Sequence, residues 1–250
     1  MTNKYMYFIA NWKMYGDLKS LNSLNKVIKF SKKHKKKKFK LIYCPPYTLL
    51  DSFSKKIKKT KIELGGQNCH YEISSGPFTG SISPKMLKKI GSNYVIIGHS
   101  ENRFAGETDG QVNKKINSST ECGLKIIFCI GETLHQKKKK ITNKILRRQI
   151  IKGLAKIKNL NNILIAYEPV WSIGTGIIPK TYELAKNINF IKNILKNNLK
   201  IKNPKVLYGG SVNSGNVKSL ASIESIDGFL IGGASQKAKN FIDIVKKTII

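Results

Sequence analysis

Short apolar segments alternate with longer amphipathic segments along the whole chain. Eight short segments are nearly continuous in apolar, β-branched or aromatic residues, which is typical of strands covered on both faces. We predict strands at residues 5–11, 39–44, 61–67, 93–99, 124–132, 162–168, 205–211 and 227–233. Between several of them, apolar residues recur at three- and four-residue spacing, and we predict helices at residues 18–33, 111–122, 141–157, 182–199 and 239–249.

The order of these elements predicts the fold class. Strands that alternate with helices are typical of an α/β protein with a parallel sheet. Ser83-Pro84 and Asp109-Gly110 are helix-start signals, and Gly91 and Gly123 are helix-stop signals. Since no Pro- or Gly-rich linker divides the 250 residues, we predict one domain over residues 1–250, with eight strand–helix units closed into a single (β/α)8 barrel. A doubly wound open sheet is the alternative.

The charge of the chain raises the question of nucleic-acid binding. There are 46 Lys and Arg residues against 14 Asp and Glu residues, which gives a formal net charge of +32. Most of the excess is lysine and is spread along the chain, as a coding bias acting on tolerant surface positions would produce. The runs at residues 35–38 and 137–140 contain no aromatic residue for base stacking, and we interpret them as solvated helix ends or loops. We therefore expect no specific nucleic-acid partner.

Other features of the composition predict a cytoplasmic protein. No apolar run reaches the roughly 20 residues that a membrane span needs, and the first residues contain no signal-peptide pattern. We therefore expect no membrane association. Cys44, Cys69, Cys122 and Cys129 form no CxxC pair and are too few for a disulfide scaffold, which favours free thiols in a reducing compartment.

Polar residues with catalytic chemistry follow three of the predicted strands. In an α/β barrel the active site lies at the carboxyl ends of the strands. Glu168 follows ILIAY, so desolvation is expected to raise the pKa of its carboxyl group and suit it to removing a carbon-bound proton. His99 follows VIIG and precedes a short predicted helix, whose N-terminus favours a neutral imidazole that donates to a carbonyl oxygen. Lys13, beside Asn11, offers a cation for a phosphate or an oxyanion, with Glu101 as its candidate partner.

Each of these residues also has a plain structural interpretation. An isolated glutamate at a strand end is more often paired with a lysine, and a lone histidine is more often a satisfied structural residue. A lysine carries almost no information in this lysine-rich chain. Only their joint placement at the ends of predicted strands one, four and six favours an active site.

Glycine-rich segments lie at the ends of the last two predicted strands, where α/β barrels commonly bind phosphate. They are YGGS at residues 208–211 and GGA at residues 232–234. Glycines let backbone N–H groups approach an anion closely. A third segment, Gly174-Thr175-Gly176, lies in a loop over residues 169–179 that is long enough to act as a lid. One GG pair could be only a tight turn, but the set in this order favours a phosphate site.

Taken together, the ordered motifs resemble the triosephosphate isomerase family over nearly the whole chain. The segments that carry the resemblance are FIANWKM (8–14), GQN (66–68), FTG (78–80), GHSE (98–101), GET (106–108), AYEPVWSIGTG (166–176), YGGSV (208–212) and FLIGGAS (229–235). The resemblance implies a (β/α)8 TIM barrel. It also implies an isomerase of glycolysis and gluconeogenesis that interconverts D-glyceraldehyde 3-phosphate and dihydroxyacetone phosphate through an enediolate, without a metal or organic cofactor.

The resemblance also implies a role for each candidate residue. Glu168 would be the base, His99 the neutral electrophile, and Lys13 with Asn11 the groups that stabilise the enediolate oxygen. This division of roles is that of the family and is not worked out from the residues alone. The backbone amides expected to bind the phosphate are those of Gly174, Ser211, Gly232 and Gly233.

A homodimer is a further implication of the resemblance. The loop at residues 68–83 would insert near the partner's active site, carrying Thr79 toward the partner's Asn11 and Lys13.

Three segments depart from the family pattern. Asn102 stands where an arginine is common, and the following segment is one residue short, which puts an ion pair of Glu107 in doubt. Tyr15 replaces a frequent asparagine near the expected dimer contact. The lid ends in Ile-Ile-Pro at residues 177–179 instead of Lys-Thr-Ala, and proline restricts a hinge. None of these changes alters a residue assigned to chemistry.

Three other functions remain as alternatives. Another phosphate-binding barrel enzyme would share the glycine segments but use a different base. A basic nucleic-acid-binding protein would show arginine clusters or exposed aromatic residues on one face. A barrel that has lost its activity would persist as a scaffold.

Overall fold

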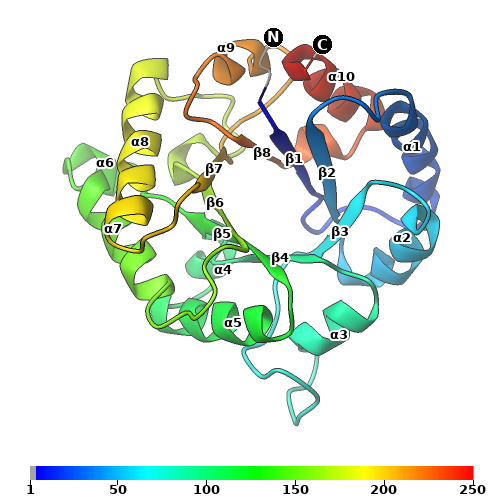
Figure 1. Ribbon diagram of the computed structural model, residues 1–250, viewed down its shortest axis with the longest axis horizontal. Helices are drawn as coiled ribbons and strands as arrows, with labels where there is room; N and C mark the ends of the chain where they lie inside the picture. The colour runs from blue at the N-terminus through cyan, green and yellow to red at the C-terminus, as the bar shows by residue number, and fades with distance from the viewer. Residues whose placement is uncertain (1–3, 250) are drawn as a thin grey trace.

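The computed structural model describes residues 4–249 and contains a closed barrel of eight parallel strands, each paired with its neighbours in chain order (Figure 1). The first and last strands, β1 and β8, pair through Tyr7–Gly228 to Ala10–Ile231 and close the barrel. The strands are β1 (Met6–Asn11), β2 (Phe39–Cys44), β3 (Glu63–Gly66), β4 (Tyr94–Ile97), β5 (Lys125–Ile130), β6 (Ile163–Tyr167), β7 (Lys205–Tyr208) and β8 (Gly228–Ile231).

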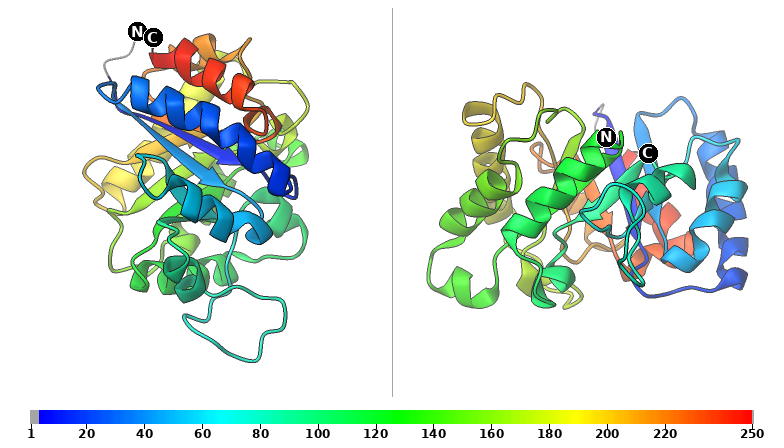
Figure 2. Two further views of the ribbon diagram at one scale, coloured as in Figure 1. Left: turned by 90° about the vertical axis from the view of Figure 1, so that its right-hand side faces the viewer. Right: turned by 90° about the horizontal axis from the view of Figure 1, so that it is seen from below.

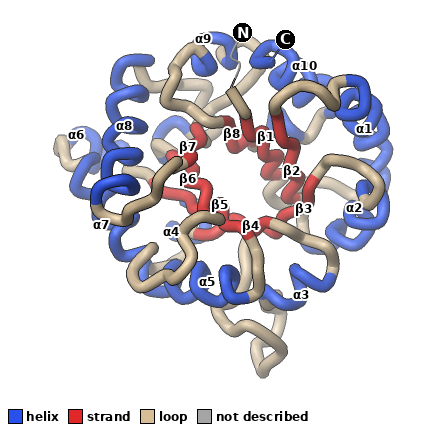
Figure 3. Tube along the Cα trace, in the orientation of Figure 1, coloured by secondary structure: helices blue, strands red, loops and turns tan. Residues whose placement is uncertain are grey.

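The helices form a ring around the barrel (Figure 3). The longest is α8, with 17 residues. The α-helices are α1 (Leu24–Lys33), α2 (Leu50–Ile57), α3 (Pro84–Lys89), α4 (Ser100–Phe104), α5 (Asp109–Glu121), α6 (Leu134–Lys138), α7 (Thr142–Gly153), α8 (Thr181–Asn197), α9 (Val217–Ala221) and α10 (Ala238–Ile249). Short 3-10 helices are η1 (Leu18–Ser23), η2 (Tyr47–Leu49), η3 (Val170–Ser172) and η4 (Gly233–Ser235).

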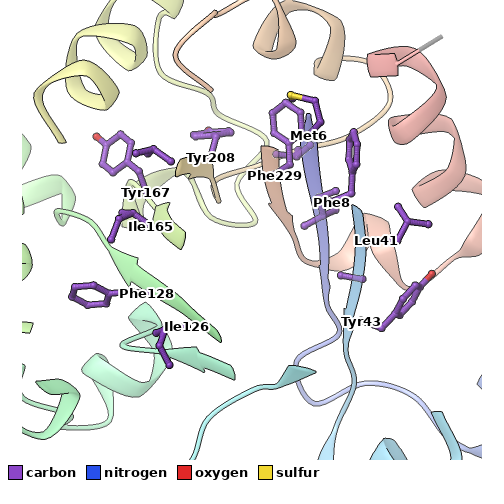
Figure 4. Packing of buried hydrophobic residues seen from close by; sticks show 14 of the residues in the cluster. Met6, Phe8, Leu41, Tyr43, Ile126, Phe128, Ile165, Tyr167, Tyr208 and Phe229 are labelled. Atoms are coloured by element: carbon purple, nitrogen blue, oxygen red, sulfur yellow. The ribbon is translucent and has the colours of Figure 1, made fainter. Parts of the chain in front are cut away.

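The apolar core has two layers, because successive side chains of a strand point to opposite faces. In β6, Leu164 and Ala166 belong to a small cluster made of strand residues, whereas Ile163, Ile165 and Tyr167 belong to a larger cluster that also contains helix residues. The small cluster is therefore the barrel interior, and the larger one fills the space between strands and helices. Part of this outer layer is drawn in Figure 4.

The eight predicted strands and the barrel are confirmed, while several boundaries differ. The fifth strand was predicted at residues 124–132 and spans Lys125–Ile130, because the chain leaves the ladder before the polar residues that form the site. The helix predicted at residues 18–33 is two elements, since a capping box of Asp17 and Ser20 begins the 3-10 helix η1 before α1 starts. Residues 1–3 and 250 of the predicted domain lie outside the described range.

The start and stop signals lie where they were predicted. Ser83 caps α3 with Pro84 in its first turn, and α5 begins at Asp109 after a capping box of Thr108 and Gln111. Gly91 and Gly123 follow helix ends with positive φ angles of 94° and 71°. Local polar chemistry therefore determines these helix ends.

One long loop projects from the barrel. Residues 68–83 connect β3 to α3 and form the extended loop in the left panel of Figure 2. The rings of His70 and Phe78 stack with centroids 4.2 Å apart, and the backbone amide of His70 donates to the carbonyl of Ile82 over 2.8 Å. The loop therefore has a structure of its own. None of the helices within residues 4–249 has the length and apolarity to cross a membrane.

Candidate active site

The alternation along the strands explains why Glu168 points into the mouth of the barrel. Leu164 and Ala166 face the interior, and the next position in that series is Glu168. The two strands beside β6 are followed by glycines, Gly131 after β5 and Gly209 after β7, and these glycines leave space for Glu168. A Cβ atom at Gly209 would lie 2.7 Å from the Glu168 Cγ atom, and one at Gly131 would lie 1.8 Å from its carbonyl oxygen. Both glycines are therefore needed where the chain approaches the glutamate.

The Glu168 carboxylate is buried, with 2% of the residue exposed. Burial raises the pKa of this carboxyl group above its usual value, although the charge of nearby Lys13 opposes the shift. Burial also raises the pKa of the neighbouring Cys129 thiol well above its usual value, so that the thiol keeps its proton beside the carboxylate. Glu168 is thus a base made stronger by desolvation and held among donors.

His99 caps helix α4, and this contact determines the tautomer of its ring. The backbone amide of Glu101 donates to His99 Nδ1 over 3.2 Å, so Nδ1 carries no proton. The Glu101 carboxylate is farther away, at 3.6 Å, and does not replace the amide. A ring that accepts at Nδ1 is neutral and carries its proton on Nε2, which lies 3.4 Å from Glu168 Oε1. The predicted neutral donor and the predicted base therefore face each other.

Lys13 has an uncommon backbone conformation at the end of β1. Its φ angle is +54°, which costs a residue with a side chain about 1–3 kcal/mol. Two side chains hold it there: Asn11 Oδ1 accepts from its amide over 3.0 Å, and Gln67 Nε2 donates to its carbonyl over 2.8 Å. The ammonium group pairs with Glu101 Oε1 at 2.7 Å, which is the partner expected from the sequence.

The predicted catalytic and substrate-binding residues line one cavity. It has a volume of about 260 Å³ and is bounded by the ends of strands that lie far apart in the sequence. The eight predicted residues among its walls are Asn11, Lys13, His99, Glu168, Gly174, Ser211, Gly232 and Gly233. A space of this size between a base, a neutral donor, a cation and glycine-rich loops accommodates a small phosphorylated molecule.

In the segment after Glu168, side-chain hydrogen bonds hold the ends of the loop, and its tip is open. Trp171 Nε1 donates to Glu132 Oε1 over 3.0 Å, and Ser172 Oγ donates to the carbonyl of Ile177 over 2.6 Å. At the tip, Gly174 and Gly176 have positive φ angles of 71° and 77°, and an added Cβ would meet no atom within 4 Å. This arrangement suits a lid whose tip moves while the two ends of the loop stay in place.

Two expectations about charged residues change with the structure. Lys137 was interpreted as solvated, but its ammonium lies 3.8 Å from the centre of the Trp171 ring and 2.8 Å from Glu183 Oε1. The sequence could not show these contacts, because Trp171 and Glu183 both come after strand β6 in the chain. Glu107 keeps an ion pair despite the short segment before it, since Lys115 Nζ lies 2.5 Å from its Oε1.

The structure also identifies supporting residues to which the sequence gave no role. Gln67 bridges the carbonyls of Lys13 and Cys44, and the buried Glu132 accepts from both Tyr167 and Trp171. Burial raises the pKa of the Glu132 carboxyl group. Gln67 lies in the GQN motif and Glu132 is the last residue of the fifth predicted strand, which are the signals that mark them.

No cluster of three or more His, Cys, Asp and Glu side chains within the described part of the chain is arranged to hold a metal ion.

Comparison with known proteins agrees with this architecture. The sequence model of the triosephosphate isomerase family matches residues 6–248. The triosephosphate isomerase of Thermodesulfovibrio yellowstonii is 40% identical over 244 residues, covering 96% of this chain and 98% of that protein. That of Dictyoglomus thermophilum is 41% identical over 247 residues, covering 95% of this chain and 97% of that protein.

A solved structure gives the same result at the level of the fold. The crystal structure of triosephosphate isomerase from Bartonella henselae matches with a TM-score of 0.89 and 36% sequence identity, covering 97% of this chain and 98% of that one. With a barrel, a family pattern over nearly all of the described residues and extensive identity to named relatives, this chain belongs to the triosephosphate isomerase family.

Proposed function

We propose that this protein interconverts D-glyceraldehyde 3-phosphate and dihydroxyacetone phosphate through an enediolate, as an isomerase of glycolysis and gluconeogenesis. The observation that carries the proposal is the convergence of Glu168 and His99, whose Oε1 and Nε2 atoms lie 3.4 Å apart in one small cavity. A base and a donor this close can act on a substrate carbon and on the oxygen of its neighbour. Family membership supports the same reaction.

Glu168 begins the reaction by taking a proton from the carbon next to the carbonyl group. The raised pKa of Glu168 makes the carboxylate a stronger base and brings that pKa closer to neutral pH, where general bases are most effective. His99 Nε2 then donates a hydrogen bond to the oxygen on which negative charge develops. In the enediolate, the hydroxyl proton of the first carbon passes to that oxygen. Glu168 then returns its proton to the second carbon, so that the first carbon becomes the carbonyl carbon.

Lys13 supplies the positive charge that stabilises the enediolate. Its ammonium group pairs with Glu101 at 2.7 Å, so it is already oriented in the cavity. We propose that the amides of Gly174, Ser211, Gly232 and Gly233 bind the phosphate. This proposal is supported by the position of the four residues, which line the same cavity as Lys13.

The direct test is an isomerisation assay with purified protein and with the Glu168→Gln variant. Glutamine keeps the size of the side chain but cannot take the proton, so the variant should fold and lose at least about 10³-fold in kcat. His99→Asn should also lower kcat. A folded Glu168→Gln variant with full activity would refute the assignment of the base. No activity in the folded parent would favour the alternative of a scaffold or of a barrel enzyme with a different phosphorylated substrate.

We also propose that the chain forms a homodimer. Large apolar side chains beside the site are exposed: Met14 by 93%, Tyr15 by 60% and Phe104 by 97%. The structured loop at residues 68–83 projects beyond the barrel (Figure 2), and Thr79 within it is exposed. A second copy that covers these residues would remove unfavourable apolar surface from water.

Sedimentation analysis tests the dimer. Met14→Glu places a charge in the expected interface and should shift the protein toward monomer, while Tyr182→Glu, at another exposed apolar position on α8, should not. A monomeric parent, or equal effects of the two variants, would contradict the proposed interface.

The remaining proposals concern location and organisation. We propose that the protein works in the cytoplasm as one domain that spans residues 1–250. Its four cysteines are free thiols, and three of them, Cys44, Cys69 and Cys129, are buried in the core, where a reducing compartment would keep them as thiols. Fractionation of cells that express the full chain tests the location.

A further inference from the structure

A second, larger cavity lies at the opposite end of the barrel from Glu168. Its volume is about 940 Å³, against about 260 Å³ for the catalytic cavity. Its walls come from the first residues of β2 and β3, the last turns of α2 and α3, and the loops that lead into these strands. Figure 3 shows the α1–β2 and α2–β3 loops on one side of the barrel. This volume is within the range of small-molecule sites.

The walls of this cavity are rich in lysine. Eight of the nineteen lining residues are lysines, more than twice the share of basic residues in the chain as a whole. Among the lining residues within 4–249, the only acidic one is Glu63, and it is already paired with Lys40. The eight are Lys35, Lys37, Lys38, Lys40, Lys55, Lys58, Lys61 and Lys89.

Two other surface hollows lack this concentration of lysine. A cavity of about 640 Å³ beside α8 has one lysine, Lys192, and one acid, Glu224. A cavity of about 470 Å³ beside α4 has two arginines offset by three carboxylates. A general excess of lysine over the whole surface would have enriched these walls as well. The large cavity is therefore a distinct electrostatic feature.

Several of its lysines have no counter-charge. Within residues 4–249, the side chains of Lys37, Lys58 and Lys89 make no hydrogen bond or ion pair, and Lys61 Nζ reaches only the carbonyl of Lys35, at 3.5 Å. The C-termini of α2 and α3 contribute a partial charge of about −0.5 each, which is small beside the net charge of the lysines. The arrangement thus places like charges around one space, and an anion would relieve their repulsion.

We propose that this cavity binds an anion with several adjacent phosphate groups, either a short polyphosphate chain or a compact, multiply phosphorylated small molecule. Lysine ammonium groups are compact charges that bind phosphate oxygens without needing a planar partner. A nucleic acid fits less well, because lysines far outnumber aromatic residues in the described walls, and the two aromatic rings there each contact a neighbouring ring. Phe39 packs on Phe30 at 6.1 Å, and Tyr5 packs edge-on against Tyr7 at 5.4 Å.

Isothermal titration calorimetry with the full-length protein tests the proposal. Tripolyphosphate and inositol hexakisphosphate serve as the chain and compact probes, at constant low ionic strength and with inorganic phosphate present to occupy the catalytic cavity. The pocket variant is Lys37→Ser with Lys58→Ser and Lys89→Ser. Its control is Lys144→Ser with Lys152→Ser and Lys239→Ser, three exposed lysines outside the cavity, so that both variants lose the same charge.

We expect one probe molecule per chain and a loss of roughly tenfold or more in affinity for the pocket variant, against less than about twofold for the control. The probe that binds more tightly identifies the chain or the compact source. Isomerase activity without probe should be the same in both variants, since the altered residues lie away from Glu168. Equal losses in the two variants, or no binding by the parent, would overturn the proposal. So would tighter binding of a single-stranded oligonucleotide at the same lysines.

Discussion

The fit between Gly209 and Glu168 allows a quantitative prediction. In a Gly209→Ala variant the new Cβ would lie 2.7 Å from Glu168 Cγ and 3.1 Å from its Oε1, whereas ordinary contact begins at 3.4 Å. The glutamate side chain must therefore move by about 0.7 Å. A misplacement near 1 Å can cost about 10²-fold in rate, so we expect kcat to fall between about 10- and 100-fold. The crowding should cost about 1–3 kcal/mol of stability.

Steady-state kinetics and chemical unfolding measure the two effects separately. KM should change less than kcat, because the loops proposed to bind phosphate keep their residues. Gly110→Ala is the matched control: its Cβ would meet only Thr108 Oγ1 at 3.9 Å, so activity should not change. A folded Gly209→Ala variant with the kcat of the parent would refute the claim that this glycine makes room for the base.

Three further predictions follow from charge. Because burial raises the pKa of Glu168, kcat/KM should fall as the pH falls through that raised value. The buried carboxylate is charged at pH 8, so Glu168→Gln should have a higher melting temperature than the parent at pH 8 but not at acid pH. Equal melting temperatures at pH 8 would contradict this. Asp227 is buried and pairs with Lys192 at 2.6 Å and with Lys4 at 2.9 Å. Burial opposes the shift, but these partners lower the pKa of Asp227, so the ion pairs stabilise the fold at neutral pH and this stabilisation is lost in acid. Asp227→Asn should therefore lower the free energy of unfolding in urea by about 3–5 kcal/mol, and a loss below 1 kcal/mol would argue against this role. The net charge of +32 predicts that the melting temperature rises with added salt, and an unchanged value would show that self-repulsion is minor.

The barrel was predictable from the sequence because its strands are buried on both faces. Apolar runs such as residues 162–168 indicate such strands without any alignment, and the end of a run gave the place of Glu168. The strand ends were less predictable, since apolar and glycine residues continue after the ladder of hydrogen bonds stops. Helices α6 and α9 have only five residues each, too few for a clear period.

The roles of the supporting residues could not be predicted, because these roles depend on contacts across the fold. In the sequence, Gly131 lies within a predicted strand and Gly209 within a glycine-rich segment assigned to phosphate binding. Only the approach of Glu168 shows why a side chain is excluded at both positions. Glu132 binds Trp171, 39 residues later in the chain, and Lys137 lies on the same ring. The lysine run at residues 35–38 likewise gained meaning only when the structure placed it beside Lys58 and Lys89.

The most direct test of the central claim is exchange of the substrate's carbon-bound hydrogen with solvent. Dihydroxyacetone phosphate is incubated with the protein in D₂O, and deuterium on carbon is followed by NMR. If Glu168 removes the proton to form an enediolate, the parent should incorporate deuterium and a folded Glu168→Gln variant should incorporate at least about 10³-fold less. Incorporation at equal rates in the two proteins would contradict the account.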